Sequence, residues 1–456
     1  MDSMAKPEAR DQDRISKLPN EVVYCILSFL PTVDAVRTTV LSKRWSQMWA
    51  KLKTLNFESN KKEFRDYEEA FSFVTFVTRV LFFRKVPEIH KFRLKMPYPQ
   101  YIPHIEDWVF TAVIRNVVEL DLHVFETGVD VFVLPECIYW CKTLRVLKLH
   151  LTPWTRTDDP PASGCFPSLK FLHVSVYNPQ ETTMNLLFSC CPVLEGLTID
   201  GTIDGNTGDH VNYNFKVSAP ELKTLRISLE NICEPVDVHI NAPKLENLDL
   251  KRLGLTNCFL IGSTKSLVNA SIAFREHFEV DKKLDLSTFA MALVDRISNV
   301  KFLSLSAHCL EDLHLPEDWH LPIFHNVNQL RLAFSEHNLL ELLAVFLSSA
   351  PTLEDLVLED RTEGYTELSE SHWNPPEEVP AGLSSNLKTI SFKGFKGRLF
   401  EMEMIKYLLK NGQLLNKMTI STSLHLSYDR RNELYTEFMM FHRAATCHVE
   451  LMHMQV

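Results

Sequence analysis

Apolar residues recur along the chain in a short pattern, L-x-x-L-x-L, in which other aliphatic or aromatic residues replace some of the leucines. Alternate side chains of a β-strand point to opposite faces, so each copy predicts a turn leading into a short strand with one buried face. Three buried aliphatic side chains give roughly 5–9 kcal/mol, whereas every ordered residue costs about 1–2 kcal/mol of backbone entropy. One copy therefore cannot fold alone, and the copies must stack. Their first positions are Leu52, Ile89, Val117, Leu144, Leu169, Leu194, Leu222, Leu245, Leu267, Val300, Val327, Leu353, Leu387 and Leu415.

The spacing of these copies is typical of leucine-rich repeats. The first position advances from 52 to 415 in thirteen steps of about 28 residues, within the 20–29 residues expected for such repeats. The sequence thus predicts an α/β solenoid, or horseshoe, whose stability is shared between neighbouring repeats. Helices are predicted between copies at 182–190 and 339–349, an extended connector at 235–241, and loops at 155–164, 201–210 and 360–371.

The stretch from Asp13 to Trp49 has a different pattern, which predicts three short helices. The first ends at Pro31, Thr32 is expected to cap the second, and Ser42 is expected to cap a third that carries Trp45 and Trp49. Helices this short cannot bury all their large apolar side chains among themselves. They could form a cap on the first repeat, or they could present a helical face to another protein.

The same stretch resembles an F-box, through LPNEVVYCILSFLP, then TVDAVRTTVLSKRW and the closing MW. Two positions depart from the common F-box pattern: Asn20 replaces an acidic residue, and Val22-Val23 replaces a Leu-Leu pair. The resemblance implies docking to a Skp-type adaptor protein, and through it to a cullin-based ubiquitin ligase. Matched to the family positions, the expected adaptor-binding residues are Leu18, Pro19, Ile26, Leu27, Leu30, Val36, Leu41 and Trp45.

The C-terminal part resembles the FBD domain that ends many plant F-box/leucine-rich-repeat proteins. The segment from Trp373 to Val379-Pro380 leads to LKTISFKGFKG, then to a predicted helix at 401–410 and a final strand at 417–420. Gly382 and Gly412 replace a common cysteine and a common alanine. We expect a disordered tail over 1–12, the F-box over 13–50, the solenoid over 51–370, and an FBD segment over 371–456 that continues the solenoid and closes its end.

Composition narrows the classes of partner and compartment. The formal charge of −10 argues against nucleic acid as the main partner, because phosphate binding requires a basic surplus. The N-terminus shows no signal peptide, and the apolar window at 71–83 is too short to span a bilayer, so no membrane partner is expected. The ten cysteines are scattered without a disulfide framework, which predicts a reducing intracellular compartment, the nucleus and/or the cytoplasm.

No catalytic or metal-binding motif in the sequence meets its required pattern. There is no phosphate-binding glycine loop, no H-E-x-x-H and no G-x-S-x-G. Cys137 and Cys141, and a terminal group of His442, Cys447, His448 and His453, could suggest zinc but have no matching second pair at the usual spacing. We therefore expect a non-catalytic protein without cofactor or metal.

Polar residues between the strand leucines form a locally basic group in the early repeats. They could be an ordinary solvated face, or they could select a target bearing acidic or phosphorylated residues or an anionic small ligand. The function expected from the whole sequence is that of a substrate-recognition subunit of an SCF-type ubiquitin ligase. The alternative is a leucine-rich-repeat scaffold without that role. The candidate target-binding residues are Arg93, Lys95, Lys148, His150 and His173.

Overall fold

The computed structural model describes residues 18–58, 67–96, 102–125, 134–152, 165–178, 181–203, 213–231, 236–253, 256–274, 292–306, 321–334, 339–361, 376, 378–423, 426 and 428–453. By internal contacts the chain divides into two units, Met1–Leu169 and Lys170–Val456. The expected tail at 1–12 lies outside the described residues.

The first unit begins with two short α-helices, α1 (Asn20–Ser28) and α2 (Thr32–Arg37), followed by 3-10 turns η1 (Thr38–Val40), η2 (Trp45–Gln47) and η3 (Trp49–Lys51). Ser42 begins the turn before Trp45, whose N–H lies 3.4 Å from the Ser42 hydroxyl and 3.1 Å from its carbonyl oxygen. The predicted third α-helix is thus replaced by 3-10 turns.

The expectation that Thr32 caps α2 was wrong. The extended Pro31 occupies the cap position, and Thr32 is the first helical residue. Its side chain faces the first strand instead, where Thr32 Oγ1 accepts a hydrogen bond of 2.7 Å from the backbone N–H of Asn56. The hydroxyl thus joins the N-terminal helices to the first repeat.

The sheet of the first unit is parallel and follows the chain order. Each strand pairs in register with the next, so equivalent positions of successive repeats are neighbours. The connections carry helices α3 and α4, which are joined by a 3.2 Å hydrogen bond from Trp108 Nε1 to Thr78 Oγ1, and the turn η5. The bounds are β1 (Thr54–Glu58), α3 (Tyr67–Phe83), β2 (Lys91–Met96), α4 (Ile102–Ile114), β3 (Glu119–Phe125), η5 (Glu136–Ile138) and β4 (Val146–Thr152).

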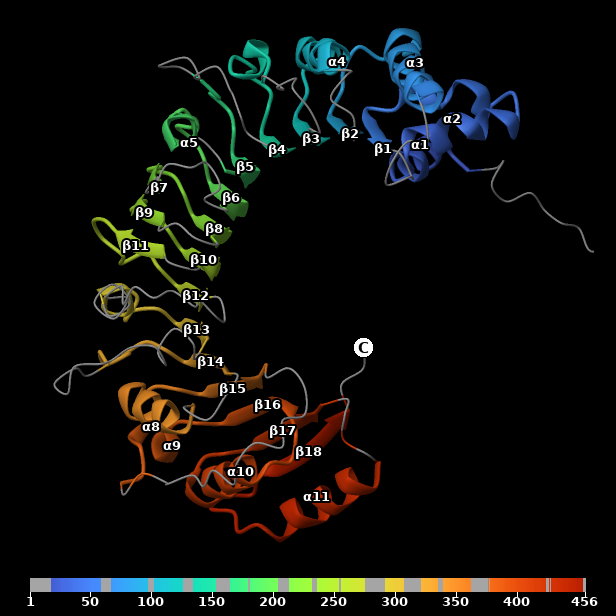
Figure 1. Cartoon of the computed structure of the whole chain (residues 1–456). Helices are drawn as coiled ribbons and strands as arrows, with labels where there is room; N and C mark the ends of the chain where they lie inside the picture. Colours follow the sequence, from blue (N-terminus) through green and yellow to red (C-terminus); the bar gives the residue numbers. More distant parts are fainter. Residues whose placement is uncertain are drawn as a thin grey trace, which may run out of the picture. The chain divides into compact units, whose positions relative to one another are not determined.

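The second unit continues the same architecture in a parallel sheet ordered β5-β6-β8-β10-β12-β13-β14-β15-β16-β17-β18 (Figure 1). Its main strands are β5 (Phe171–Tyr177), β6 (Gly196–Ile203), β8 (Thr224–Asn231), β10 (Asn247–Leu253), β12 (Asn269–Phe274), β13 (Phe302–Ser306), β14 (Gln329–Phe334), β15 (Asp355–Asp360), β16 (Thr389–Phe395), β17 (Lys417–Thr422) and β18 (His448–His453).

The connections of this unit mix helices with a small second sheet. Strands β7 (Tyr213–Ser218), β9 (Val236–Asn241) and β11 (Thr256–Leu260) pair in the order β11-β9-β7, which confirms the extended connector at 235–241. The helices of this unit include α5 (Glu181–Ser189), α8 (Leu339–Ser349), α9 (Ala381–Ser385), α10 (Leu399–Asn411) and α11 (Tyr428–Met440), and residues 292–296 are also helical. The helices predicted at 182–190, 339–349 and 401–410 are thus confirmed.

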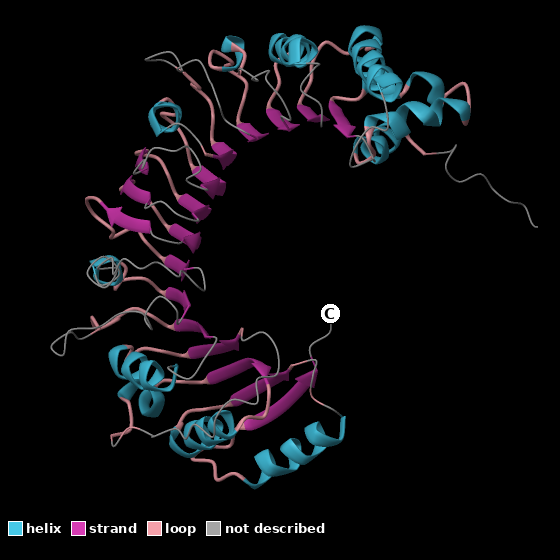
Figure 2. Ribbon diagram, in the orientation of Figure 1, coloured by secondary structure: helices cyan, strands magenta, loops and turns pink. Residues whose placement is uncertain are grey.

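In each unit the helical connections lie on one side of the main strands, as Figure 2 shows, and the other face of the sheet carries no helix among the described residues. We call this second side the open face. All three apolar positions of every predicted copy are buried, which confirms the strand assignment throughout. Within the part of the chain that the structure describes, no helix combines the length and apolarity that crossing a bilayer would require.

Two details of the C-terminal part differ from expectation. The strand predicted at 417–420 is present as β17, but it is not the final one, because β18 follows it. In the copy that contains β18, Thr446 stands at the first apolar position, which hid this copy of the pattern. Helix α11 was not predicted. The predicted loop at 155–164 lies outside the described residues, as does most of the loops at 201–210 and 360–371.

Candidate functional site

The N-terminal helices have a small core of their own. It comprises Val23, Leu27, Ala35, Trp45, Met48 and Leu52, with Leu18, Tyr24, Leu30 and Trp49 partly buried against it. Leu52 is also the first apolar position of the first repeat, so this core is continuous with the solenoid. Two expected adaptor-binding residues, Leu27 and Trp45, are only 1% and 5% exposed. They can shape an interface, but their side chains are already occupied by the core.

Other apolar side chains of these helices have no such cover in the described part of the chain. Val22 and Ile26 of α1 and Phe29, which directly follows it, recur at one-turn spacing and are 41%, 43% and 82% exposed. Val40 and Leu41, after α2, are 86% and 63% exposed. Of the remaining expected residues, Pro19 is exposed and Val36 is half-buried. Val22, Phe29 and Val40 were not among the residues expected from the sequence, because exposure depends on how α1 and α2 pack.

Arg44 fixes the start of α1. Its Nη2 donates to the carbonyl oxygen of Leu18 and, over 2.8 Å, to Oδ1 of Asn20, which also accepts from Nε over 3.2 Å. Asn20 stands where the F-box pattern has an acidic residue. Its amide oxygen therefore supplies the acceptor that a carboxylate would supply, without the negative charge.

The open face of the first unit is less basic than the sequence suggested. Glu58 lies 3.8 Å from Nη1 of Arg93 and 3.2 Å from Nζ of Lys95, and Glu119 lies 3.5 Å from Nζ of Lys148. Each distance joins a carboxylate oxygen to a cationic nitrogen. The two glutamates lie on strands next to those of the basic candidate residues, so the face carries alternating charges.

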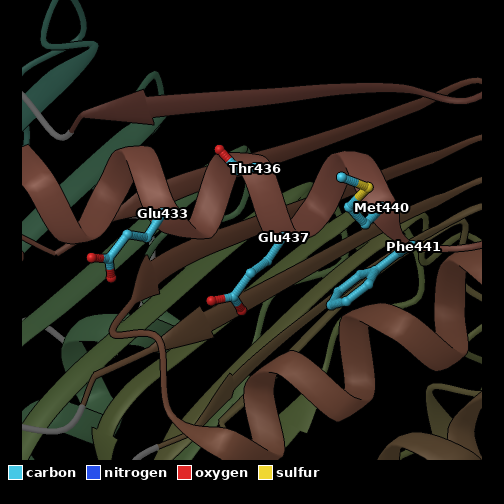
Figure 3. A pocket seen from close by; sticks show the side chains of 5 residues that line it. All are labelled: Glu433, Thr436, Glu437, Met440 and Phe441. Atoms are coloured by element: carbon cyan, nitrogen blue, oxygen red, sulfur yellow. The ribbon is translucent and has the colours of Figure 1, made fainter.

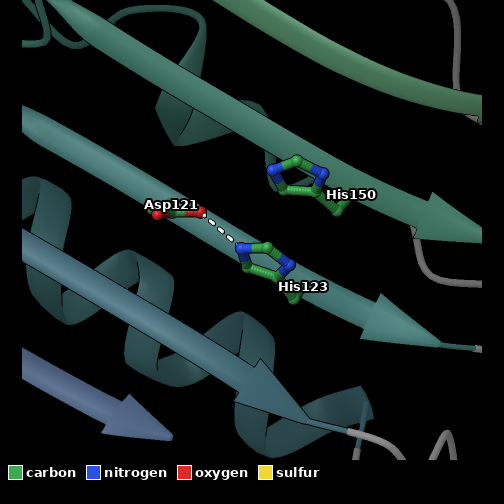
Figure 4. A group of neighbouring side chains, drawn as sticks. All are labelled: Asp121, His123 and His150. Carbon is green, nitrogen blue, oxygen red and sulfur yellow. Dashed lines mark ion pairs between the residues drawn. The ribbon is translucent and has the colours of Figure 1, made fainter. Parts of the chain in front are cut away.

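A compact polar group lies at the centre of this face and contains Asp121, His123 and His150 (Figure 4). Nε2 of His123 is 2.9 Å from Oδ1 of Asp121, and the two imidazole rings are stacked with centroids 3.9 Å apart. Burial of Asp121 alone would raise its pKa. The His123 imidazole and the charges of Arg93 and Lys148 outweigh that effect and lower the pKa of Asp121 below its usual value.

On the second unit His173 also faces a carboxylate. Its Nε2 is 2.8 Å from Oδ1 of Asp200, which accepts a second contact of 2.8 Å from the Ser175 hydroxyl. Further along the open face, Asp249 lies 2.9 Å from Nε of Arg226 and 3.0 Å from Nζ of Lys251. Here too, these cations are paired with acids from the same or the neighbouring strand.

Comparisons with known proteins agree with this architecture. An F-box domain model matches residues 15–57, a model of the leucine-rich repeats of the FBD-associated F-box protein At5g56370 matches 105–264, and an FBD model matches 374–420. The Arabidopsis thaliana FBD-associated F-box protein At4g10400 is 31% identical over 441 residues, which cover 95% of this chain and 98% of the relative.

The chain belongs to the F-box/FBD/leucine-rich-repeat protein family. Other Arabidopsis relatives include the F-box/FBD/LRR-repeat protein At3g52680, 32% identical over 90% of this chain and 86% of the relative. The FBD-associated F-box protein At5g56370 is 32% identical over 90% of both chains. F-box proteins generally act as non-catalytic substrate adaptors of SCF-type ubiquitin ligases.

A buried charge network in this F-box protein joins the end of β15 to the FBD part. Asp360, at the end of β15, has a fully buried side chain that contacts Arg398 and lies 3.3 Å from Nζ of Lys396. Glu401 is also buried, accepts backbone N–H bonds from Lys396 and Arg398, and so caps α10. Burial raises the pKa of Glu401 despite the neighbouring arginine. Because its polar atoms are paired within the protein, the network fits a structural role.

Gly382, one of the two departures from the FBD pattern, lies where two elements approach closely. A Cβ at this position would be 2.5 Å from the carbonyl oxygen of Leu347 and 2.7 Å from that of Ala350. Glycine therefore permits the close approach between α8 and α9 in this chain.

A hollow of about 460 Å³ lies along α11 and is lined by Glu433, Thr436, Glu437, Met440 and Phe441 (Figure 3). It is wide open to solvent, and its lining side chains come from α11 and the residue that follows it. Among the described residues it offers no convergent polar groups from a second element, which small-ligand sites normally have.

The cysteines considered for zinc are poorly suited to it. Burial, with a smaller effect of Cys141, raises the pKa of Cys137 to about 11, and burial likewise raises the pKa of Cys447. A raised pKa disfavours the thiolate that binds metal. Within the described residues, neither cysteine belongs to a group of three or more potential metal ligands.

Proposed function

We propose that this protein is the substrate-recognition subunit of an SCF-type ubiquitin ligase. Its F-box would bind a Skp-type adaptor and its repeats would select the target for ubiquitination. The observation that supports this most directly is the set of exposed apolar side chains Val22, Ile26, Phe29, Val40 and Leu41. They lie beside a helical core that is already complete without them.

The exposed set has the chemistry of an unpartnered protein interface. Fully burying one large aliphatic or aromatic side chain is worth about 1.5–3 kcal/mol. Leaving several exposed within about twenty residues forgoes that gain and favours association. A partner that covered Phe29, Ile26 and Leu41 would recover it. Leu27 and Trp45 would contribute indirectly, by holding α1 in place, because they are buried.

Within this proposal the repeats act by proximity. A bound target would be held near the ubiquitin-transfer machinery, so this chain needs no catalytic group of its own. Recognition would use the open face of each unit, with Arg93, Lys95, Lys148 and His150 on the first and His173 on the second, beside acidic neighbours. A more acidic or phosphorylated target segment could replace Glu58 and Glu119 as the partner of these cations.

The FBD segment would continue the repeats and close the C-terminal end of the sheet. Its strands β16 and β17 pair in the same parallel register as the strands before them, and β18 follows β17. We retain the boundaries 13–50, 51–370 and 371–456 for the F-box, the solenoid and the FBD segment as part of this proposal. An unprotected edge strand invites pairing with other chains, which a closing segment would limit.

The test is co-purification of a Skp-type subunit with variants of the full chain. Ile26→Asp combined with Phe29→Asp should abolish co-purification, because two charges would enter a dry interface. Phe82→Asp is the matched control, because Phe82 is 78% exposed on α3 and lies outside the F-box helices. It should bind the adaptor as the parent does. Retained binding by the double variant, with the repeats folded, would refute the proposed adaptor site.

The alternative, a repeat scaffold with the N-terminal helices as a cap, has one observation in its favour. The helices are attached to the first repeat through the hydrogen bond from the Asn56 N–H to Thr32 Oγ1 and through Leu52 in the helical core. A pure cap requires no adaptor. If the parent chain is monomeric and well behaved alone and fails to retain a Skp-type subunit, the scaffold function is favoured.

A further inference from the structure

The group formed by Asp121, His123 and His150 arises directly from the repeat geometry. Asp121 and His123 are two residues apart on β3, so their side chains lie on the same face of the sheet. His150 is the direct neighbour of His123 in the parallel pairing of β3 with β4. An acidic residue and two imidazoles are thereby gathered on the open face of the first unit by backbone pairing alone.

Their atoms are close enough to share one ligand. One side-chain donor atom from each of the three residues lies within 4.8 Å of the other two. Figure 4 shows that both imidazoles turn a ring nitrogen toward the Asp121 side of the group. Asp121 is only 6% exposed, and its Oδ1 receives no well-aligned hydrogen bond from the described residues, although His123 Nε2 is 2.9 Å away. A buried carboxylate oxygen without a full partner is costly unless something else binds it.

We propose that Asp121, His123 and His150 bind a divalent transition-metal ion of the zinc class. Two imidazoles and one carboxylate are a donor set that such ions accept, with a further coordination position left for water or an incoming ligand. Metal–ligand bonds of about 2.0–2.2 Å place the ligand atoms of a tetrahedral site about 3.3 Å apart. The ligand atoms now lie within 4.8 Å of one another, so the stacked imidazoles would have to rotate until their ring nitrogens converge on the ion.

The charged residues around Asp121, His123 and His150 are compatible with a bound cation. Arg93 Nε lies 3.4 Å from the other carboxylate oxygen of Asp121, Oδ2, and so would orient the carboxylate while leaving Oδ1 for the ion. Lys148, which pairs with Asp121 across the strands, has its Nζ 3.5 Å from Glu119, so its charge is partly neutralised. Glu58 similarly offsets Arg93 and Lys95. These carboxylates reduce the repulsion that a divalent cation would meet.

The competing interpretation is that the two stacked imidazoles simply pack against each other above a paired aspartate. Packing alone predicts no ion-dependent property and tolerates an uncharged side chain of similar shape. A metal site, in contrast, depends on each donor atom. The two interpretations therefore separate in a binding measurement. That measurement is independent of the proposed ligase role, because it needs neither an adaptor nor a target.

The experiment uses the full-length chain, freed of affinity tags and stripped of metal, and titrates it with Zn²⁺ by calorimetry and with Co²⁺ by visible absorption. The parent is compared with Asp121→Asn and His150→Gln, which keep approximate shape. His173→Gln is the matched control: His173 is also an inner-strand histidine beside an aspartate, yet it belongs to no three-ligand group among the described residues. Adaptor co-purification of the same samples reports separately on the proposed function.

We expect Asp121→Asn and His150→Gln to lower the Zn²⁺ affinity at least about 100-fold, because loss of even an outer partner of a metal ligand typically costs 10–100-fold. His173→Gln should match the parent. The Co²⁺ spectrum of the parent should lack thiolate charge-transfer absorption, which distinguishes this site from the cysteines if a variant fails to fold. A parent that binds no Zn²⁺, or equal binding by the parent and both site variants, would overturn the proposal.

Discussion

The strand assignment makes a strong prediction about two adjacent residues of β8. Leu225 is completely buried and pairs with Leu197 of β6 on one side and Leu248 of β10 on the other, both also buried. Thr224, one residue earlier, is exposed. Replacing each residue by aspartate therefore introduces the same side chain at adjacent positions, once in the buried core and once at the surface.

The expected difference follows from what each side chain contacts. Removing a buried leucine side chain costs about 2–5 kcal/mol, and an unpaired polar group in its place adds about 1–3 kcal/mol. Burial would raise the pKa of the carboxyl group introduced in place of Leu225, which limits but does not remove the cost. Leu225→Asp should thus approach the about 5–15 kcal/mol that stabilises a typical domain. Thr224→Asp should change stability by about 0.5 kcal/mol or less.

Amide hydrogen exchange followed by peptide is the suitable assay, because repeat arrays can unfold locally. Leu225→Asp should accelerate exchange in β6, β8 and β10, whereas Thr224→Asp should leave the parent pattern. A Leu225→Ala variant serves as the control for lost packing without added polarity and should give an intermediate effect. Similar acceleration by both aspartate variants would refute the inward and outward assignment of this strand.

Two further predictions concern charge. Partial burial alone would raise the pKa of Glu359, but the hydrogen bond from Arg331 and the charge of Arg361 outweigh this effect and lower the pKa below its usual value. The stabilisation from this ion pairing is therefore present above the unfolded pKa and is lost as pH falls through the folded pKa. Glu359→Gln should therefore destabilise the protein in urea titrations at neutral pH, and the difference from the parent should shrink below about pH 4.5; a difference independent of pH would contradict the ion pairing. Reversing the charge of the basic residues of the first unit should remove part of the set of captured target proteins while the adaptor stays bound. An unchanged set of captured proteins would show that these residues form an ordinary solvated face. The residues to reverse to glutamate are Arg93, Lys95 and Lys148.

Most of the sheet could be predicted from the sequence because each repeat carries its own set of three apolar strand positions. The apolar positions of one copy are close together in sequence, have the same spacing in every copy and are all buried, so every predicted strand was found. The extra strand β18 was hidden because Thr446 stands at its first apolar position, although Val449 is buried in register with Met418. The choice between an α-helix and 3-10 turns after Ser42 depended on packing around Trp45 and could not be decided from capping residues.

The candidate sites were harder to predict because they depend on contacts between repeats. Asp121, His123 and His150 could each be recognised as outward-facing from the sequence, but their proximity requires the pairing of β3 with β4. The surplus of positive charge was overestimated for the same reason. Glu58 and Glu119 flank the central positions of their strands, and only the aligned strands show that they face the cations.

The proposed function places stability and recognition on opposite faces of the same strands. Because the buried face is filled by the leucine-type positions, the alternate positions can change with little loss of packing. The open face can therefore accumulate charges and imidazoles, provided that each is paired or solvated, as Asp200 is with His173 and Ser175. The F-box helices show a similar division: Leu27 is buried in the core, and Phe29, two residues later, is exposed and is proposed to contact a partner. In both places the exposed functional candidates are residues that the fold does not need to bury.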